Sequence, residues 1–166
     1  GFTCIQRRAV SRPTFLYVSV PWPRWARNDL QSNYLSMPAG EGFGSVAFID
    51  AVVRTLEGVT HLYIYTDCLA FQCAINSEAS GSPQMDALVR WLLDRHPGVQ
   101  FLAFHQPGKR NRAADGLSRD GHGGEKARTI VGEALAAELL PEEIELSDVS
   151  WEMFKGVATL PQRATK

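Results

Sequence analysis

The chain is poor in several features that mark particular classes of protein. It has three cysteines in 166 residues, Cys4, Cys68 and Cys73, and none of them form a CxxC pair. This number and spacing argue against a zinc site or a disulfide framework and favour a reducing intracellular compartment: cytosol, nucleus or organelle. No apolar run approaches the ~20 residues of a membrane span. Polar residues interrupt the first ten positions, unlike a signal peptide.

The chain also lacks a strong net charge, but its charges are unevenly distributed. The formal net charge is -1, which by itself does not indicate a nucleic-acid-binding protein. Residues 1–30 nevertheless contain five arginines and one acid, whereas residues 129–152 contain seven acids and no lysine or arginine. The basic start and acidic end are therefore expected to contact different partners. The acidic end is expected to dock on the domain's own basic face or on a protein partner.

Hydrophobic residues make up 45% of the chain, enough for a sizeable core. Patterning predicts strands over residues 1–6, 14–20, 61–66 and 99–105. It predicts helices over residues 45–56, 69–76, 84–95, 112–119 and 127–140, with a loop-rich stretch over 28–44. Because strands alternate with helices in the middle of the chain, the fold class expected is α/β.

Two acidic residues occupy positions that suit chemistry. Asp67 follows the strand predicted over 61–66, and ligands of open α/β sheets gather at the carboxyl ends of strands. The alternative is that Asp67 caps the next helix. Asp115 opens a short predicted helix after Lys109 and Arg110. Cations beside a metal-binding acid would bind phosphates, and the alternative is a solvated loop with surface ion pairs.

Taken together, the segments around Asp67 and Asp115 form a longer sequence pattern than either acid alone. Residues 62–70 read LYIYTDCLA, and residues 104–119 read FHQPGKRNRAADGLSR. The pair resembles the ribonuclease H domain of retroelement reverse transcriptases of the LTR or DIRS type. Those domains carry a TD at the end of the fourth strand and later a segment H-x-PGK-x-N-x-x-AD-x-LSR. The resemblance extends over residues 1–119 and is strongest from Ala47 onward.

The resemblance implies a three-layer fold, with a mixed sheet between helices on both faces. It also implies phosphodiester hydrolysis with two Mg²⁺ ions about 4 Å apart, held by four acids. By position, Asp67 and Asp115 match the third and fourth acids. Lys109, Arg110, Asn111 and Arg112 then form a nucleic-acid-binding turn. The domains expected are 1–119, ribonuclease-H-like, and 120–166, an acidic helical extension.

The other two acids have no clear match. The family's helix glutamate falls at Phe48, which cannot bind a metal. Asp50 lies two residues on, about 200° around the helix, so it is expected to face away. Glu41 is the other substitute, but it lies in the loop predicted before the helix. Residues 1–6 match the family's second strand. The first strand is therefore missing here and is expected upstream in a longer parent or on another polypeptide.

Trp22 and Trp25 have two interpretations each, and His96 has one. Trp22 and Trp25, interleaved with arginines, suit stacking on bases, but beside prolines they are more typical of packing anchors. His96 is expected to end a helix and to interact with its last carbonyls.

We therefore expect a degenerate ribonuclease-H-like domain that does not cleave and that binds RNA, RNA/DNA hybrid or protein within a larger assembly. The alternative is an active ribonuclease H that uses Mg²⁺ to cleave RNA in RNA/DNA hybrids, with its first strand outside this chain. Mg²⁺ would be needed only if the acidic site is functional. A third possibility is a purely structural domain without nucleic-acid contacts.

Overall fold

The computed structural model describes residues 2–6, 14–31, 35–119 and 124–160. The strands in this part of the chain are β1 (Phe2–Gln6), β2 (Thr14–Val18), β3 (His61–Thr66), β4 (Gln100–His105) and β5 (Leu140–Glu143). The helices are α1 (Arg24–Gln31), α2 (Met37–Thr55), α3 (Leu69–Ser77), α4 (Pro83–Arg95), α5 (Arg112–Arg119), α6 (Glu125–Ala136) and α7 (Asp148–Ala158), with a 3₁₀ turn η1 (Gly108–Arg110) before α5. The predicted α/β class is confirmed.

The strands form two sheets, where the sequence predicted one mixed sheet. In the first sheet β2 lies in the centre, antiparallel to β1 and parallel to β5. In the second, β3 and β4 run parallel. Among the described strands, β1 pairs only with β2, and β3 only with β4. No backbone hydrogen-bond ladder links β1 to β3 among the described strands, so the five strands do not form one sheet.

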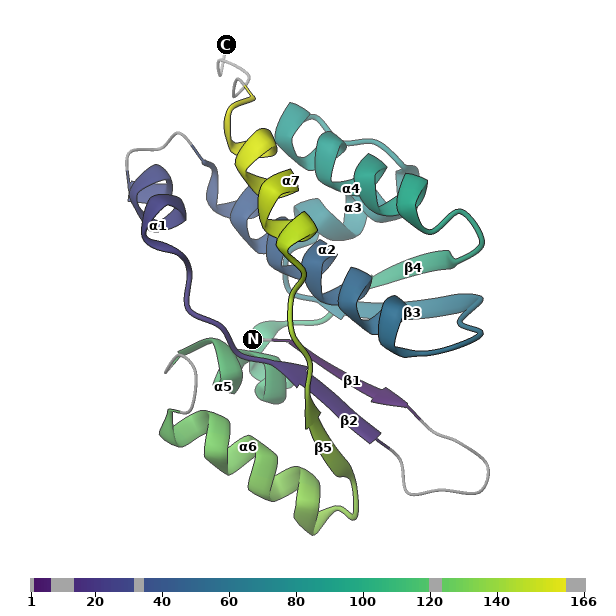
Figure 1. Cartoon of the computed structure of the whole chain (residues 1–166), viewed down its shortest axis with the longest axis vertical. Helices are drawn as coiled ribbons and strands as arrows, with labels where there is room; N and C mark the ends of the chain where they lie inside the picture. Colours follow the sequence, from purple (N-terminus) through teal and green to yellow (C-terminus); the bar gives the residue numbers. More distant parts are fainter. Residues whose placement is uncertain (1, 7–13, 32–34, 120–123, 161–166) are drawn as a thin grey trace.

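Helices cover both faces of the first sheet (Figure 1). On one face of β2, Leu16 and Val18 pack in a cluster with Phe48 of α2. On the other face, Phe15 packs with Ile130 of α6 and with α5. The alternation of buried side chains along β2 thus follows the period of two expected for a strand buried on both sides. Around this sheet the arrangement has three layers.

The second sheet is covered on one face only. Leu62 and Ile64 of β3 face the helices and pack against the largest hydrophobic cluster, which is built from α2, α3, α4 and α7. Tyr63 and Tyr65 lie on the opposite face and are exposed. The sheet therefore presents an apolar face that no described helix covers.

Helix α2 begins in the stretch that the sequence predicted to be a loop, and that prediction is wrong. Ser36 caps the helix, its hydroxyl accepting a hydrogen bond from the Ala39 N–H at 3.3 Å. The glycines that suggested a loop instead permit close packing. A Cβ on Gly42 would lie 2.8 Å from the Met85 Sδ atom of α4, so a larger residue would force the end of the Met85 side chain to move.

The last part of the chain packs into the main body of the protein. Phe154 of α7 stacks on Phe43 of α2, with ring centroids 3.8 Å apart. Trp22 and Trp25 lie against Phe154 at 5.8 and 5.3 Å, which confirms that they are packing anchors. The helix predicted over 127–140 ends earlier, and strand β5 follows it and joins the first sheet.

Glu78 offers a test of backbone strain at the end of α3. It has φ 54° and ψ 18°, in the left-handed region that penalises any residue with a Cβ. We expect Glu78→Gly to raise the free energy of unfolding by about 0.5–1 kcal/mol, measured by urea denaturation. Glu78→Ala keeps the Cβ and is the matched control. An equal gain in both variants would show that the backbone angle is not the cause.

Candidate functional site

Asp67 lies where the sequence placed it, directly after the end of β3. The Thr66 Oγ1 atom accepts a hydrogen bond from the Cys68 N–H at 3.1 Å and shapes the turn into α3. Cys68, rather than Asp67, is the N-cap residue of α3, so the interpretation of Asp67 as the helix cap is wrong. The Asp67 side chain is exposed at this edge of the sheet.

The segment that carries Asp115 runs beside Asp67. The Gln106 N–H donates to the Thr66 carbonyl at 2.8 Å, which holds the end of β4 to the end of β3. A Cβ on Gly108 would lie 2.9 Å from the Asp67 Oδ2 atom, so the turn η1 packs directly on this carboxylate. Asp115 follows in the first turn of α5, where its N–H donates to the Asn111 carbonyl at 3.0 Å. The structure thus places Asp67 against the turn that leads to Asp115.

The basic turn is open to solvent. Lys109 and Arg110 are exposed, and neither makes an ion pair with another residue in the described part of the chain. Arg112 lies 3.8 Å from Glu133 of α6, and both side chains are largely exposed. Such a surface pair contributes about 0–1 kcal/mol, so Arg112 can exchange Glu133 for a phosphate. Asn111 is half-buried at the end of η1.

Phe48 stands in an apolar environment rather than among acids. Its side chain is 6% exposed and packs against β2 beside Leu16, Val18 and Val52. A carboxylate at this position would be buried without water, and burial of an unpaired charge is strongly unfavourable. The local structure around position 48 is therefore built for an aromatic ring.

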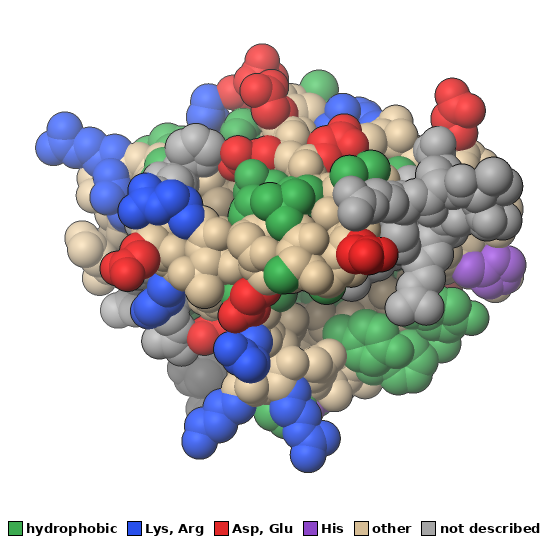
Figure 2. Space-filling model, turned by 90° about the horizontal axis from the view of Figure 1, so that it is seen from below, with side chains coloured by type: hydrophobic (Ala, Val, Ile, Leu, Met, Phe, Trp, Pro, Cys, Tyr) green, Lys and Arg blue, Asp and Glu red, His purple; other side chains and the backbone are tan. Residues whose placement is uncertain are grey.

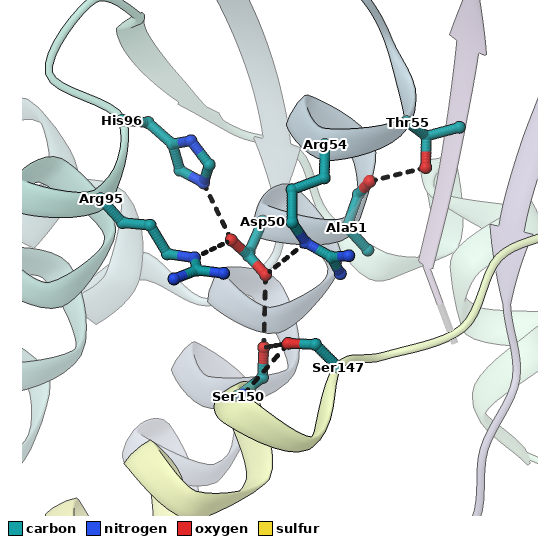
Figure 3. Close-up of polar contacts among 8 residues, drawn as sticks. All are labelled: Asp50, Ala51, Arg54, Thr55, Arg95, His96, Ser147 and Ser150. Carbon is teal, nitrogen blue, oxygen red and sulfur yellow. Dashed lines mark hydrogen bonds and ion pairs between the residues drawn. The ribbon is translucent and has the colours of Figure 1, made fainter.

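Asp50 lies in a buried ion-pair cluster (Figure 3). Its Oδ1 atom accepts from Arg95 Nε at 2.6 Å and contacts His96 Nε2 at 2.9 Å. Its Oδ2 atom accepts from Arg54 Nε at 3.0 Å and from the Ser150 Oγ of α7 at 3.4 Å. Burial raises the pKa of Asp50, but the hydrogen bonds from Arg95, His96 and Arg54 outweigh it and leave that pKa below its ordinary value.

This cluster corrects two interpretations made from the sequence. Asp50 does face away from the site, as predicted, but both of its oxygens are occupied, so it cannot substitute as a metal ligand. His96 does end α4, but its ring contacts the Asp50 carboxylate instead of the last helix carbonyls. The signal available in the sequence was the i, i+4 pair of Asp50 and Arg54, which is typical of a helix ion pair.

Glu41 is a helix residue that affects the Cys68 thiol. Because α2 starts at Met37, Glu41 lies on the helix and not in a loop. Burial raises the pKa of the Cys68 thiol to about 11, and a hydrogen bond with the Glu41 carboxylate adds to this effect. Glu41 therefore reaches the residue next to Asp67. The thiol stays protonated at neutral pH and is a poor nucleophile.

We tested whether these residues fit a pair of Mg²⁺ ions. Two Mg²⁺ ions that share one site require a cluster of carboxylates around a common centre. Within residues 2–6, 14–31, 35–119 and 124–160, no group of three or more His, Cys, Asp or Glu side chains is placed to hold a metal ion. Phe48 and the occupied Asp50 explain why the middle of α2 supplies no ligand. The described residues do not fit a two-metal centre.

Comparisons with known proteins identify no relative. No family model, no curated protein and no solved structure matches this chain. The described helices also include none that is both long and apolar enough to cross a membrane.

Proposed function

We propose that this chain is a ribonuclease-H-like module of retroelement origin that binds RNA and does not cleave it. One observation carries the proposal: the middle of α2 holds a buried Phe48 and a fully paired Asp50, so no acid there can complete a metal site with Asp67 and Asp115. The three layers around the first sheet support the finer fold assignment, as does the turn of residues 106–111 packed on Asp67.

The exposed turn next to Asp67 supports the binding part of the proposal. Lys109 and Arg110 project without described ion-pair partners, and Arg112 holds only a long surface contact. When such cations bind the phosphates of a nucleic acid, they release the counterions that surround it. The affinity for the nucleic acid therefore depends steeply on salt. Asp67 and Asp115 then remain as parts of the turn's architecture and not as catalysts.

The proposal includes a protein partner for the acidic residues after position 119. The apolar side of α7 is used internally, through Phe154 and Val157. Glu142 and Glu145, on and just after β5, are exposed and have no described ion-pair partner. A basic protein surface would complement them.

The contact of Glu41 with Cys68 favours a second candidate, an active ribonuclease H that uses Mg²⁺ to cleave RNA in RNA/DNA hybrids. Glu41 raises the pKa of the Cys68 thiol, and it lies on the helix from which the family's second acid comes. A cleavage assay separates the two candidates.

The test uses a labelled RNA/DNA hybrid with Mg²⁺ or Mn²⁺ to measure cleavage, and a labelled single-stranded RNA to measure binding. We expect no cleavage by the wild-type chain, together with RNA binding that weakens as salt rises. Lys109→Ala/Arg110→Ala should reduce the salt slope of log K by about 1.4, since each phosphate contact on a single strand contributes about 0.7. Arg90→Ala, an exposed arginine on α4, is the matched control. Metal-dependent cleavage that Asp67→Asn abolishes would establish the active enzyme instead.

A further inference from the structure

The uncovered face of the second sheet carries a row of large apolar side chains. Tyr63 and Tyr65 of β3 are 63% and 60% exposed, and Leu102 and Phe104 of β4 are 44% and 39% exposed. The strand register pairs Tyr63 with Leu102 and Tyr65 with Phe104, so these four side chains, the aromatic strip, share one face. Figure 2 shows hydrophobic side chains gathered on the right, the side on which Figure 1 places β3 and β4.

Neighbouring rings of the aromatic strip pack against one another. Tyr65 and Phe104 stack with centroids 5.5 Å apart and planes 24° from parallel. Tyr63 lies 6.3 Å from Phe104 with an interplanar angle of 34°. Because these rings support each other on two paired strands, they lose little side-chain entropy when a planar ligand stacks on their exposed parts.

Positive charge lies at one end of the strip. Asp67 comes directly after β3, two residues beyond Tyr65, so strand alternation places it on the same face as Tyr63 and Tyr65. Gly108 packs against its carboxylate. The turn η1, with its exposed Lys109 and Arg110, therefore stands at the carboxyl end of the strip. Ring faces beside exposed cations complement the bases and phosphates of one strand of nucleic acid.

The size of the strip decides between occupants. Two strands spaced about 4.8 Å apart and six residues long present a face of roughly 200 Å². A stable protein interface buries about 800 Å² on each partner, so the strip is too small to hold a second copy of the chain or another protein by itself. It does match two or three stacked bases, the number that aromatic residues on a sheet hold in RNA-binding domains.

We propose that the aromatic strip binds unpaired bases of single-stranded nucleic acid, with Lys109 and Arg110 contacting the adjacent phosphates. This inference rests on the proposed RNA-binding function and names the surface and the form of its ligand. Double-stranded nucleic acid is disfavoured because its bases stack on each other and offer no free face to Tyr63, Tyr65 or Phe104.

The experiment measures fluorescence anisotropy of a labelled 10-nucleotide single-stranded RNA with the full chain. We expect Tyr65→Leu and Phe104→Leu each to weaken binding at least about fivefold, since stacking of one base contributes ~1–3 kcal/mol. Tyr65→Phe keeps the ring and should bind like the wild type. Leucine keeps the sheet face apolar, so thermal melting should report an intact fold.

The outcomes separate the failure of the two proposals. If the wild-type chain binds no RNA, the proposed function fails and the strip assignment fails with it. If the wild type binds but Tyr65→Leu and Phe104→Leu bind equally well, only the strip assignment is wrong. Equal affinity for a duplex of the same sequence also contradicts it. Concentration-dependent dimerisation that Tyr65→Leu abolishes would assign the strip to a second copy.

Discussion

Phe154→Ala is expected to lower the free energy of unfolding by about 3–5 kcal/mol, the largest loss from any single truncation that we predict. Phe154 is fully buried, stacks on Phe43 and contacts Trp22 and Trp25. Removing the ring leaves a cavity between α7 and α2. The neighbouring aromatic rings are rigid and closely packed, so they fill this cavity only in part. Urea denaturation followed by tryptophan fluorescence gives the measurement.

Val149→Ala is the matched control for this experiment. Val149 lies on the same helix but is 51% exposed, so its truncation should change stability by less than about 0.5 kcal/mol. A loss below about 1 kcal/mol for Phe154→Ala would contradict the packing of α7. It would favour the boundary predicted near residue 119, with the rest of the chain as a separate extension.

Asp50→Ala is expected to cost about 3 kcal/mol. Breaking a buried ion pair by removing one partner costs about 3–5 kcal/mol, because the other charge is left without compensation. The loss falls near the lower end of that range, since the Arg54 and Arg95 side chains are 38% and 34% exposed and regain water. Urea denaturation at pH 7 measures it. Glu57→Ala removes an exposed acid just after α2 and should be nearly neutral.

The pH dependence of the same variant identifies the charge as the cause. The pKa of Asp50 lies below its ordinary value of 3.8 in the folded chain, because the hydrogen bonds from its partners outweigh burial. The stability that its ionisation contributes is therefore fully present above about pH 4 and is lost as the pH falls through the folded pKa. The difference in the free energy of unfolding between wild type and Asp50→Ala should therefore shrink as the pH falls below 4. A difference that stays the same or grows below pH 4 would contradict this account.

The sequence predicted most elements whose signals are local. Strand β3 and helix α4 appear within one or two residues of their predicted bounds, because their apolar periodicity is regular and Gly or Pro lies at their ends. The start of α2 was missed because Gly40, Gly42 and Gly44 lower helix propensity. The space beside Gly42 is occupied by the end of the Met85 side chain of α4, a contact that the residues of α2 alone do not predict.

The candidate site divides in the same way. The positions of Asp67 and of the turn over residues 107–111 follow from short-range patterns, and both lie where the sequence placed them. The role of Asp50 did not follow, because three of its partners lie 45, 46 and 100 residues away along the chain. The aromatic strip was also missed. Alternation along β3 predicts that Tyr63 and Tyr65 share a face but does not predict whether a helix covers it.

The order of the elements between residues 45 and 119 and the acid at the end of β3 were determined by the sequence alone, since each depends on neighbours a few positions apart. The tertiary structure decided that α7 belongs to the core, that Asp50 is an ion-pair centre, that Glu41 reaches Cys68 and that one sheet face stays open. The physical reason is that burial and charge pairing depend on which distant segments meet. A segment's own residues set the face it can bury but not the partner that buries it.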